Sequence, residues 1–157
     1  MKICGIDPGL FGGIGFIAVD KGELLGYSSL KMPTNTLRHT VKGVTFNMVD
    51  VSAIHEAVAY ERPDVIIIER QVGRPNQSSV ATHTAGTNYG IILSLNLLKL
   101  PVHIVAPDQW KKRLGISKDK KEATDLCLSI FGASAPKKDG PAEALLLAWY
   151  GHLEELR

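Results

Sequence analysis

Four acidic side chains stand where they could act together in phosphodiester chemistry. Asp7 and Glu69 each end an apolar run, and Asp139 and Glu143 are four residues apart, so they share a face if a helix begins at Asp139. Four carboxylates cannot crowd together unneutralised. Two divalent cations about 3.5–4 Å apart are the usual solution, one activating water and the other stabilising the leaving oxygen. Oxygen ligands favour Mg²⁺, with Mn²⁺ expected to substitute.

The turn after Asp7 is unusually rich in small residues. Pro8 and Gly9 allow the chain to reverse at once, and Gly12, Gly13 and Gly15 keep bulk away from the acid. Taken alone, this pattern is compatible with three structures: a carboxylate that holds a metal, a hairpin that binds nucleotide phosphates, or a plain hairpin in which Asp7 only forms the turn.

Five strands are predicted to position the first two acids. An antiparallel meander comprises Lys2 to Asp7, Gly13 to Val19 and Glu23 to Met32, and two further strands span Asp64 to Glu69 and Val102 to Val105. The β-branched run before Glu69 is typical of a strand buried on both faces of a parallel sheet. If this strand runs parallel beside the first one, Asp7 and Glu69 converge at one sheet edge. The alternative is an exposed strand-end glutamate.

Helices are expected to flank this mixed sheet in a single α/β domain covering residues 1–157. They are predicted from Met48 to about Glu61 with Asn47 as cap, over Ala81 to Lys99, from Pro107 onward, over about Asp119 to Phe131, and from Asp139 onward. Pro33 to Gly43 and Arg70 to Ser79 are polar and are predicted to be loops. Gly86 and Gly90 suggest a close approach by another helix, either within the chain or from a second subunit.

Composition narrows the class of protein. The 157 residues are 45% hydrophobic and 22% charged, as expected for a soluble globular domain, and the net charge is only +2. Cys4 and Cys127 have no metal-ligand spacing and are predicted to be core residues in a reducing compartment. Without a recognisable targeting or membrane-spanning segment, we expect an intracellular protein of a bacterial or phage-infected cell, or of an organelle if a transit segment was removed.

Basic residues concentrate in one region. Between Lys111 and Lys138 there are eight of them against three acidic residues. This surplus indicates either a polyanion contact or a solvated lysine-rich helix.

Taken together, the motifs resemble those of the RuvC-type Holliday-junction resolvases of the RNase H-like superfamily, most of all its phage and plant-organelle branches. The matching stretches, in chain order, are Gly5-Ile6-Asp7-Pro8-Gly9, Ile67-Ile68-Glu69-Arg70-Gln71, Tyr89-Gly90, Pro107-Asp108-Gln109-Trp110-Lys111-Lys112, Lys120-Lys121-Glu122-Ala123 and Lys137 to Ala148. The resemblance implies an RNase H-like fold. It also implies a homodimeric, Mg²⁺-dependent endonuclease of DNA recombination and repair that nicks a four-way junction symmetrically.

The resemblance also implies roles for residues. Asp7 would bridge two metals, Glu69 and Glu143 would hold one each, and Asp139 would complete the site or orient water. DNA contacts are expected from Arg70, Gln71, Arg74, Asn76, Gln77, Ser78, Lys111, Lys112, Lys118, Lys120 and Lys121. The chain departs from the bacterial pattern twice: the fourth acid is Glu143 rather than Asp, and no aromatic residue lies between Arg70 and Tyr89 to wedge open the crossover.

Three other readings remain open from the sequence. A nuclease of the same fold could act on flaps, other branched DNA or structured RNA. An ATP-binding domain of the actin and sugar-kinase type has a similar phosphate hairpin but needs two such domains. A non-catalytic junction-binding protein would keep the basic region but would have no use for four acids.

Overall fold

A five-stranded mixed sheet forms the centre of the molecule. The computed structural model describes residues 1–38, 45–71 and 78–156. In spatial order the strands are β3 (Glu23–Lys31), β2 (Gly13–Asp20), β1 (Lys2–Asp7), β6 (Val65–Glu69) and β7 (Val102–Val105). The β3-β2-β1 meander is antiparallel, whereas β6 runs parallel to both β1 and β7. The predicted meander with two added parallel strands is confirmed.

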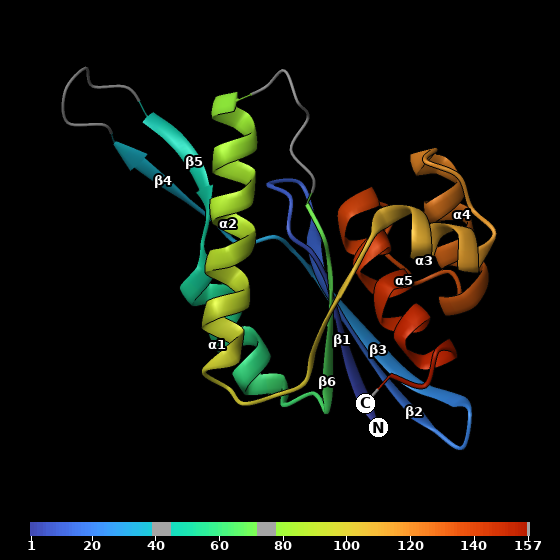
Figure 1. Ribbon diagram of the computed structural model, residues 1–157. Coiled ribbons are helices and arrows are strands. Elements are labelled where there is room, and N and C mark those ends of the chain that lie inside the picture. Colours follow the sequence, from blue (N-terminus) through green and yellow to red (C-terminus); the bar gives the residue numbers. More distant parts are fainter. Residues whose placement is uncertain (39–44, 72–77, 157) are drawn as a thin grey trace.

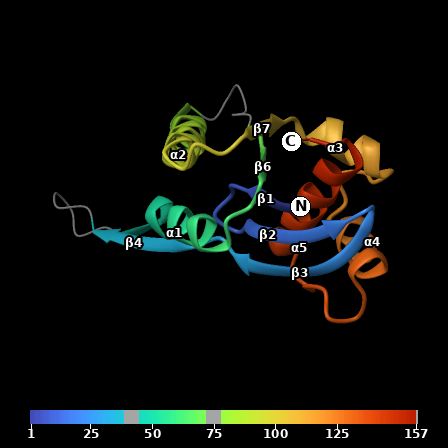
Figure 2. The same ribbon diagram turned by 90° about the horizontal axis from the view of Figure 1, so that it is seen from below.

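Helices cover both faces of the sheet (Figures 1 and 2). On one side lie α1 (Val51–Glu61) and α2 (Ser78–Asn96), which pack against each other. On the other side lie α3 (Pro107–Leu114), α4 (Lys120–Phe131) and α5 (Asp139–Leu153), of which α5 lies directly on β1 and β2. None of the described helices combines the length and apolar character needed to cross a membrane.

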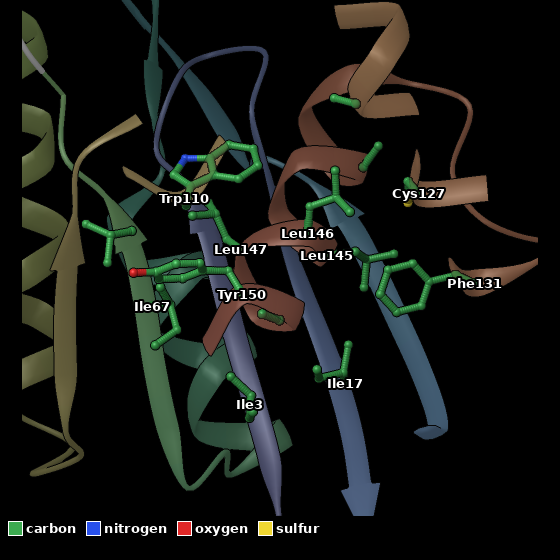
Figure 3. Close-up of a cluster of buried hydrophobic side chains, with 14 of the residues drawn as sticks. Ile3, Ile17, Ile67, Trp110, Cys127, Phe131, Leu145, Leu146, Leu147 and Tyr150 are labelled. Carbon is green, nitrogen blue, oxygen red and sulfur yellow. The ribbon is translucent and has the colours of Figure 1, made fainter. Parts of the chain in front are cut away.

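The alternation of side chains along the strands produces two apolar cores. On β6, Val65 and Ile67 belong to the core beneath α5, whereas Ile66 and Ile68 belong to the core beneath α1 and α2. Figure 3 shows the first core, in which side chains of the sheet meet those of α5 and Trp110. The two cysteines are buried and unpaired, as predicted, one in each core.

Glycines allow α5 to approach the sheet more closely than side chains would permit. A Cβ atom added to Gly5 would lie 2.1 Å from the Ala144 carbonyl oxygen, and one added to Gly15 would lie 2.6 Å from the Leu145 nitrogen. The helix backbone therefore rests almost on the strand backbone. This contact determines where the first turn of α5 lies relative to the strand ends.

Two predictions about the stretch before α1 are wrong. The segment predicted as a loop from Pro33 contains β4 (Thr34–Arg38), which pairs with β5 (Thr45–Val49) as a separate antiparallel hairpin. Met48 and its predicted cap Asn47 are therefore in a strand, and α1 begins only at Val51. β4 lacks the apolar alternation of a half-buried strand, and β5 shows it only over Phe46 and Met48, while the two strands pair with each other outside the main sheet.

The actual cap of α1 is Asp50, whose side chain accepts a hydrogen bond from the backbone N–H of Ala53 at 3.0 Å. The predicted long helix is present as α2, although it begins at Ser78 and ends at Asn96 rather than spanning Ala81 to Lys99.

Candidate active site

Asp7 and Glu69 end neighbouring parallel strands, as predicted. The β1–β6 register pairs Ile6 with Ile68, so the two acids follow at the next position of each strand. Side chains alternate between the two faces of a sheet, so Asp7 lies on the same face as Ile3, and Glu69 lies on the same face as Ile67. Both isoleucines pack beneath α5. The side chains of the two acids therefore belong to the α5 face at the carboxyl edge of the sheet.

The first turn of α5 completes this edge. The helix begins at Asp139, as predicted, and Glu143 follows one turn later. The β1–β2 turn holds the start of the helix in place, because a Cβ on Gly140 would lie 2.1 Å from the Phe11 carbonyl oxygen. Asp139 and Glu143 are thereby brought to the edge that carries Asp7 and Glu69.

Asp7 lies in an electrostatically unfavourable position for a carboxylate. Burial, and then the nearby Glu69 and Glu143 carboxylates, raise the pKa of Asp7 to about 7. A hydrogen bond from the Gly9 N–H to Asp7 Oδ1 at 3.3 Å and the Lys111 ammonium oppose this rise without cancelling it. Three carboxylates thus repel one another at a site with too little positive charge of its own.

Glu69 is oriented by a residue to which the sequence assigned no role. The buried indole Nε1–H of Trp110 donates to Glu69 Oε2 at 2.7 Å. Burial raises the pKa of Glu69, whereas this hydrogen bond lowers it and so favours the ionised form. The signal in the sequence was a tryptophan in a short polar helix, since a buried indole N–H usually requires an acceptor.

Two lysines hold the helix acids. Lys111 Nζ lies 2.6 Å from Glu143 Oε1, and both side chains are largely buried. Lys120 Nζ lies 2.5 Å from Asp139 Oδ2 in a more exposed pair, and this contact lowers the pKa of Asp139. The structure therefore brings Asp7, Glu69 and Glu143 together, whereas Asp139 lies beside them and pairs with Lys120.

In this arrangement, the described residues include no group of three or more Asp, Glu, His or Cys side chains close enough together to hold a metal ion. Glu143 and Asp139 each accept a hydrogen bond from a lysine instead. The donor types nevertheless suit a hard divalent cation, because they are carboxylate oxygens beside a half-buried Asp7 whose charge Lys111 compensates only in part.

Comparisons with known proteins identify the fold. No family model and no curated protein sequence matches the chain. Among solved structures, Thermus thermophilus RuvC in complex with a Holliday junction substrate superposes with a TM-score of 0.69 at 22% identity, covering 99% of this chain and 96% of that one. The chain has a RuvC-type fold. A second Thermus thermophilus RuvC structure gives a TM-score of 0.68, also at 22% identity, with the same coverage of both chains.

A viral protein shares the RuvC-type fold. The Fowlpox virus resolvase with its substrate Holliday junction DNA superposes with a TM-score of 0.59 at 16% identity, covering all of both chains. The resemblance read from the motifs is therefore confirmed at the level of the fold.

The RuvC-type fold places the predicted DNA-contact residues on three segments. Arg70 and Gln71 directly follow Glu69, and Arg70 is exposed. Lys111 and Lys112 lie on α3, and Lys118, Lys120 and Lys121 lie in the following loop and at the start of α4. Apart from Lys111, these lysines are exposed. Arg74, Asn76 and Gln77 fall outside the described residues, and Ser78 begins α2.

Proposed function

We propose that the chain is a single nuclease domain that resolves four-way DNA junctions by symmetric paired nicks. The observation that carries the proposal is the convergence of Asp7, Glu69 and Glu143 at the strand ends of a RuvC-type fold, where burial and then the neighbouring carboxylates raise the pKa of Asp7 and Glu69. The solved structures with this fold include two proteins bound to Holliday junction DNA. This support favours a junction over flaps or structured RNA.

The four acids would hold divalent cations, Mg²⁺ in the first instance. When bound, such cations activate water and stabilise the leaving oxygen of a phosphodiester. The chain's own residues prepare the site: Trp110 donates a hydrogen bond that favours ionised Glu69, and the β1–β2 turn seats the start of α5. Lys111 and Lys120, which hold Glu143 and Asp139 in the present arrangement, would be released to the phosphate backbone once cations neutralise the acids.

The direct test is an end-labelled mobile four-way DNA junction incubated with the protein in Mg²⁺, and resolved on a denaturing gel. We expect paired nicks at symmetric positions that ligase can seal, and none in EDTA. A flap and an RNA–DNA hybrid serve as comparison substrates. If the protein cleaves the flap or the hybrid faster than the junction, that molecule is the preferred substrate instead. If the protein binds the junction in Mg²⁺ without cleaving it, the catalytic proposal is wrong.

We further propose that the protein acts as a homodimer through α2. Symmetric nicking needs two sites related by a two-fold axis, and one chain supplies one site. Tyr89, Leu93 and Leu97 recur every fourth residue along α2 and its end, with exposed fractions of 68%, 65% and 76%. Gly90 packs against Val51, but a Cβ on Gly86 would meet no described atom within 4 Å. An apolar stripe beside an open glycine suits a second copy of the same helix.

Leu93→Glu is therefore expected to convert the dimer to a monomer, because it buries a charge in a self-complementary apolar contact. Light scattering at micromolar concentration should report half the wild-type mass, and the variant should lose paired nicking. Leu25→Glu is the matched control, since Leu25 is 68% exposed on β3, away from α2. A wild-type protein that is monomeric while it makes paired nicks would contradict the dimer.

A further inference from the structure

We propose that a hollow beside the acids, between the β1–β2 turn, β4 and the start of α5, binds one nucleotide of the DNA strand, with its phosphate on Lys31 and Lys138 and its base on Phe11. This inference rests on the proposed function, because it supplies that site with a contact to the strand beside the cleavage point. Phe11 and Lys31 were not among the residues expected to contact DNA, and Lys138 was expected only as one member of the basic region.

The first observation is an exposed aromatic side chain on a backbone that is held in place. Gly12 N–H donates to the Gly9 carbonyl at 2.8 Å, which closes a turn with Leu10 and Phe11 at its two central positions. Phe11 is 88% exposed, yet its backbone is fixed against Gly140 at the start of α5. The ring therefore extends into solvent from a fixed backbone position four residues after Asp7.

The second observation is a pair of facing lysines. Lys31 ends β3 opposite Gly13 in the β2–β3 register, and Lys138 directly precedes α5. Both side chains line the same hollow, and the nearby Lys138 ammonium lowers the pKa of Lys31. Within the described residues neither lysine is in an ion pair with an acid. Two repelling ammonium groups are relieved by one shared anion, and a phosphodiester supplies it.

The third observation is the space between these groups. The lining of a hollow of about 520 Å³ includes Phe11, Lys31 and Lys138, together with Thr34, Lys120 and Asp139. This volume is within the range of ligand sites. Asp139 belongs both to this hollow and to the acidic edge, so a strand whose cleaved phosphate lies at Asp7 has its neighbouring nucleotide here.

The combination favours a nucleotide over an isolated phosphate or an acidic peptide. An aromatic ring next to a cation pair matches the way proteins bind single-stranded nucleic acid, with the backbone on lysines and a base stacked on the ring. It also offers an aromatic contact to the strand in a chain that has none between Arg70 and Tyr89.

The lysine pair is tested by the salt dependence of junction binding, measured by fluorescence anisotropy in Ca²⁺ to suppress cleavage. Log affinity falls as log salt rises. In the Lys31→Gln/Lys138→Gln double variant, this negative slope should become shallower by about 0.7 to 0.9, the value for one lost phosphate contact. The Lys31→Arg/Lys138→Arg variant should restore the wild-type slope. Lys21→Gln, at the distant β2–β3 turn, should leave it unchanged.

The stacking contact is tested with 2-aminopurine placed in turn at the nucleotides flanking the cleavage site. Quenching on binding should occur at one position and should be lost in Phe11→Leu, whereas Tyr60→Leu, which alters an aromatic 85% exposed on α1, should keep it. An unchanged slope in the double Gln variant, or unchanged quenching in Phe11→Leu, would overturn the nucleotide site.

The two proposals fail separately. If the wild-type protein cuts junctions but the variants bind and quench as wild type, the nucleotide site is wrong and the resolvase proposal stands. If the wild-type protein binds DNA with the expected slope and quenching but never cuts it in Mg²⁺, the catalytic proposal is wrong and the nucleotide site stands. A wild-type protein that does not bind DNA at all would end both.

Discussion

Asp7→Asn is expected to reduce junction cleavage by roughly a thousandfold or more while leaving junction binding intact. The side chain lies at the centre of the carboxylates, where both Glu69 and Glu143 influence its charge. An amide keeps the shape but cannot neutralise a cation. Single-turnover cleavage in Mg²⁺ and binding in Ca²⁺ separate the two effects.

The same substitution should stabilise the metal-free protein. The pKa of Asp7 is about 7 in the folded protein against 3.8 for the unperturbed group, so the unfolded chain binds fewer protons between these values. The stability that the protonated group contributes is therefore fully present below about pH 3.8 and is lost as pH rises through about 7. An asparagine side chain does not ionise. The free energy of unfolding of the Asp7→Asn variant should therefore exceed that of wild type by between about 1 and 4 kcal/mol at pH 8 and by little at pH 4.

Urea unfolding in EDTA at both pH values measures this difference, and added Mg²⁺ should stabilise wild type more than the variant. Asp20→Asn is the control, because Asp20 also ends a strand but is exposed, at the end of β2 farther from the acids. Normal cleavage by Asp7→Asn would show that the catalytic centre lies elsewhere. Equal stability of both proteins at pH 8 would show that Asp7 carries no unfavourable charge.

Gly5→Ala is expected to destabilise the protein by at least about 3 kcal/mol, at the upper end of the cost of overpacking. The added Cβ would lie 2.1 Å from the Ala144 carbonyl oxygen and 2.5 Å from the Ala148 nitrogen. Both atoms belong to the α5 backbone, which cannot rotate away as a side chain can. The helix must shift, and it carries Asp139 and Glu143 with it, so cleavage should fall as well.

Gly26→Ala provides the matched strand control. Gly26 is a β3 residue at which an added Cβ would meet no described atom within 4 Å, so stability should change by less than about 1 kcal/mol. The midpoint of urea unfolding monitored by circular dichroism measures both variants. Coincident midpoints for Gly5→Ala and wild type would mean that α5 does not rest on β1 as described.

Local patterns in the sequence were sufficient to predict most of the architecture. The β-branched run from Val65 to Ile68 required a strand buried on both faces, and it is one. The parity of that strand and of β1 then directed Asp7 and Glu69 to one face, since side chains alternate with a period of two. The spacing of Asp139 and Glu143 similarly predicted a shared helix face, because the helix begins at the first of them.

Local patterns failed where pairing occurs outside the main sheet. The β4–β5 hairpin is polar along most of its length, and its strands satisfy their backbone groups with each other. Apolar alternation marks only β5, at Phe46 and Met48, and no short turn marks the hairpin in the sequence. Asn47, which resembled a helix cap, instead accepts a hydrogen bond from Thr36 across the hairpin at 2.9 Å.

Only the tertiary structure decided which partner each acid meets. Glu69 receives its hydrogen bond from Trp110, which is 41 residues away along the chain, and Glu143 pairs with Lys111, which is 32 residues away. Lys31 and Lys138 come from distant parts of the sequence and line one hollow. Periodicity determines the face on which a side chain lies, because it follows from backbone geometry within one element. The choice among several lysines and acids depends on how closely α3 and α5 approach the strand ends, and that distance is set by packing between elements.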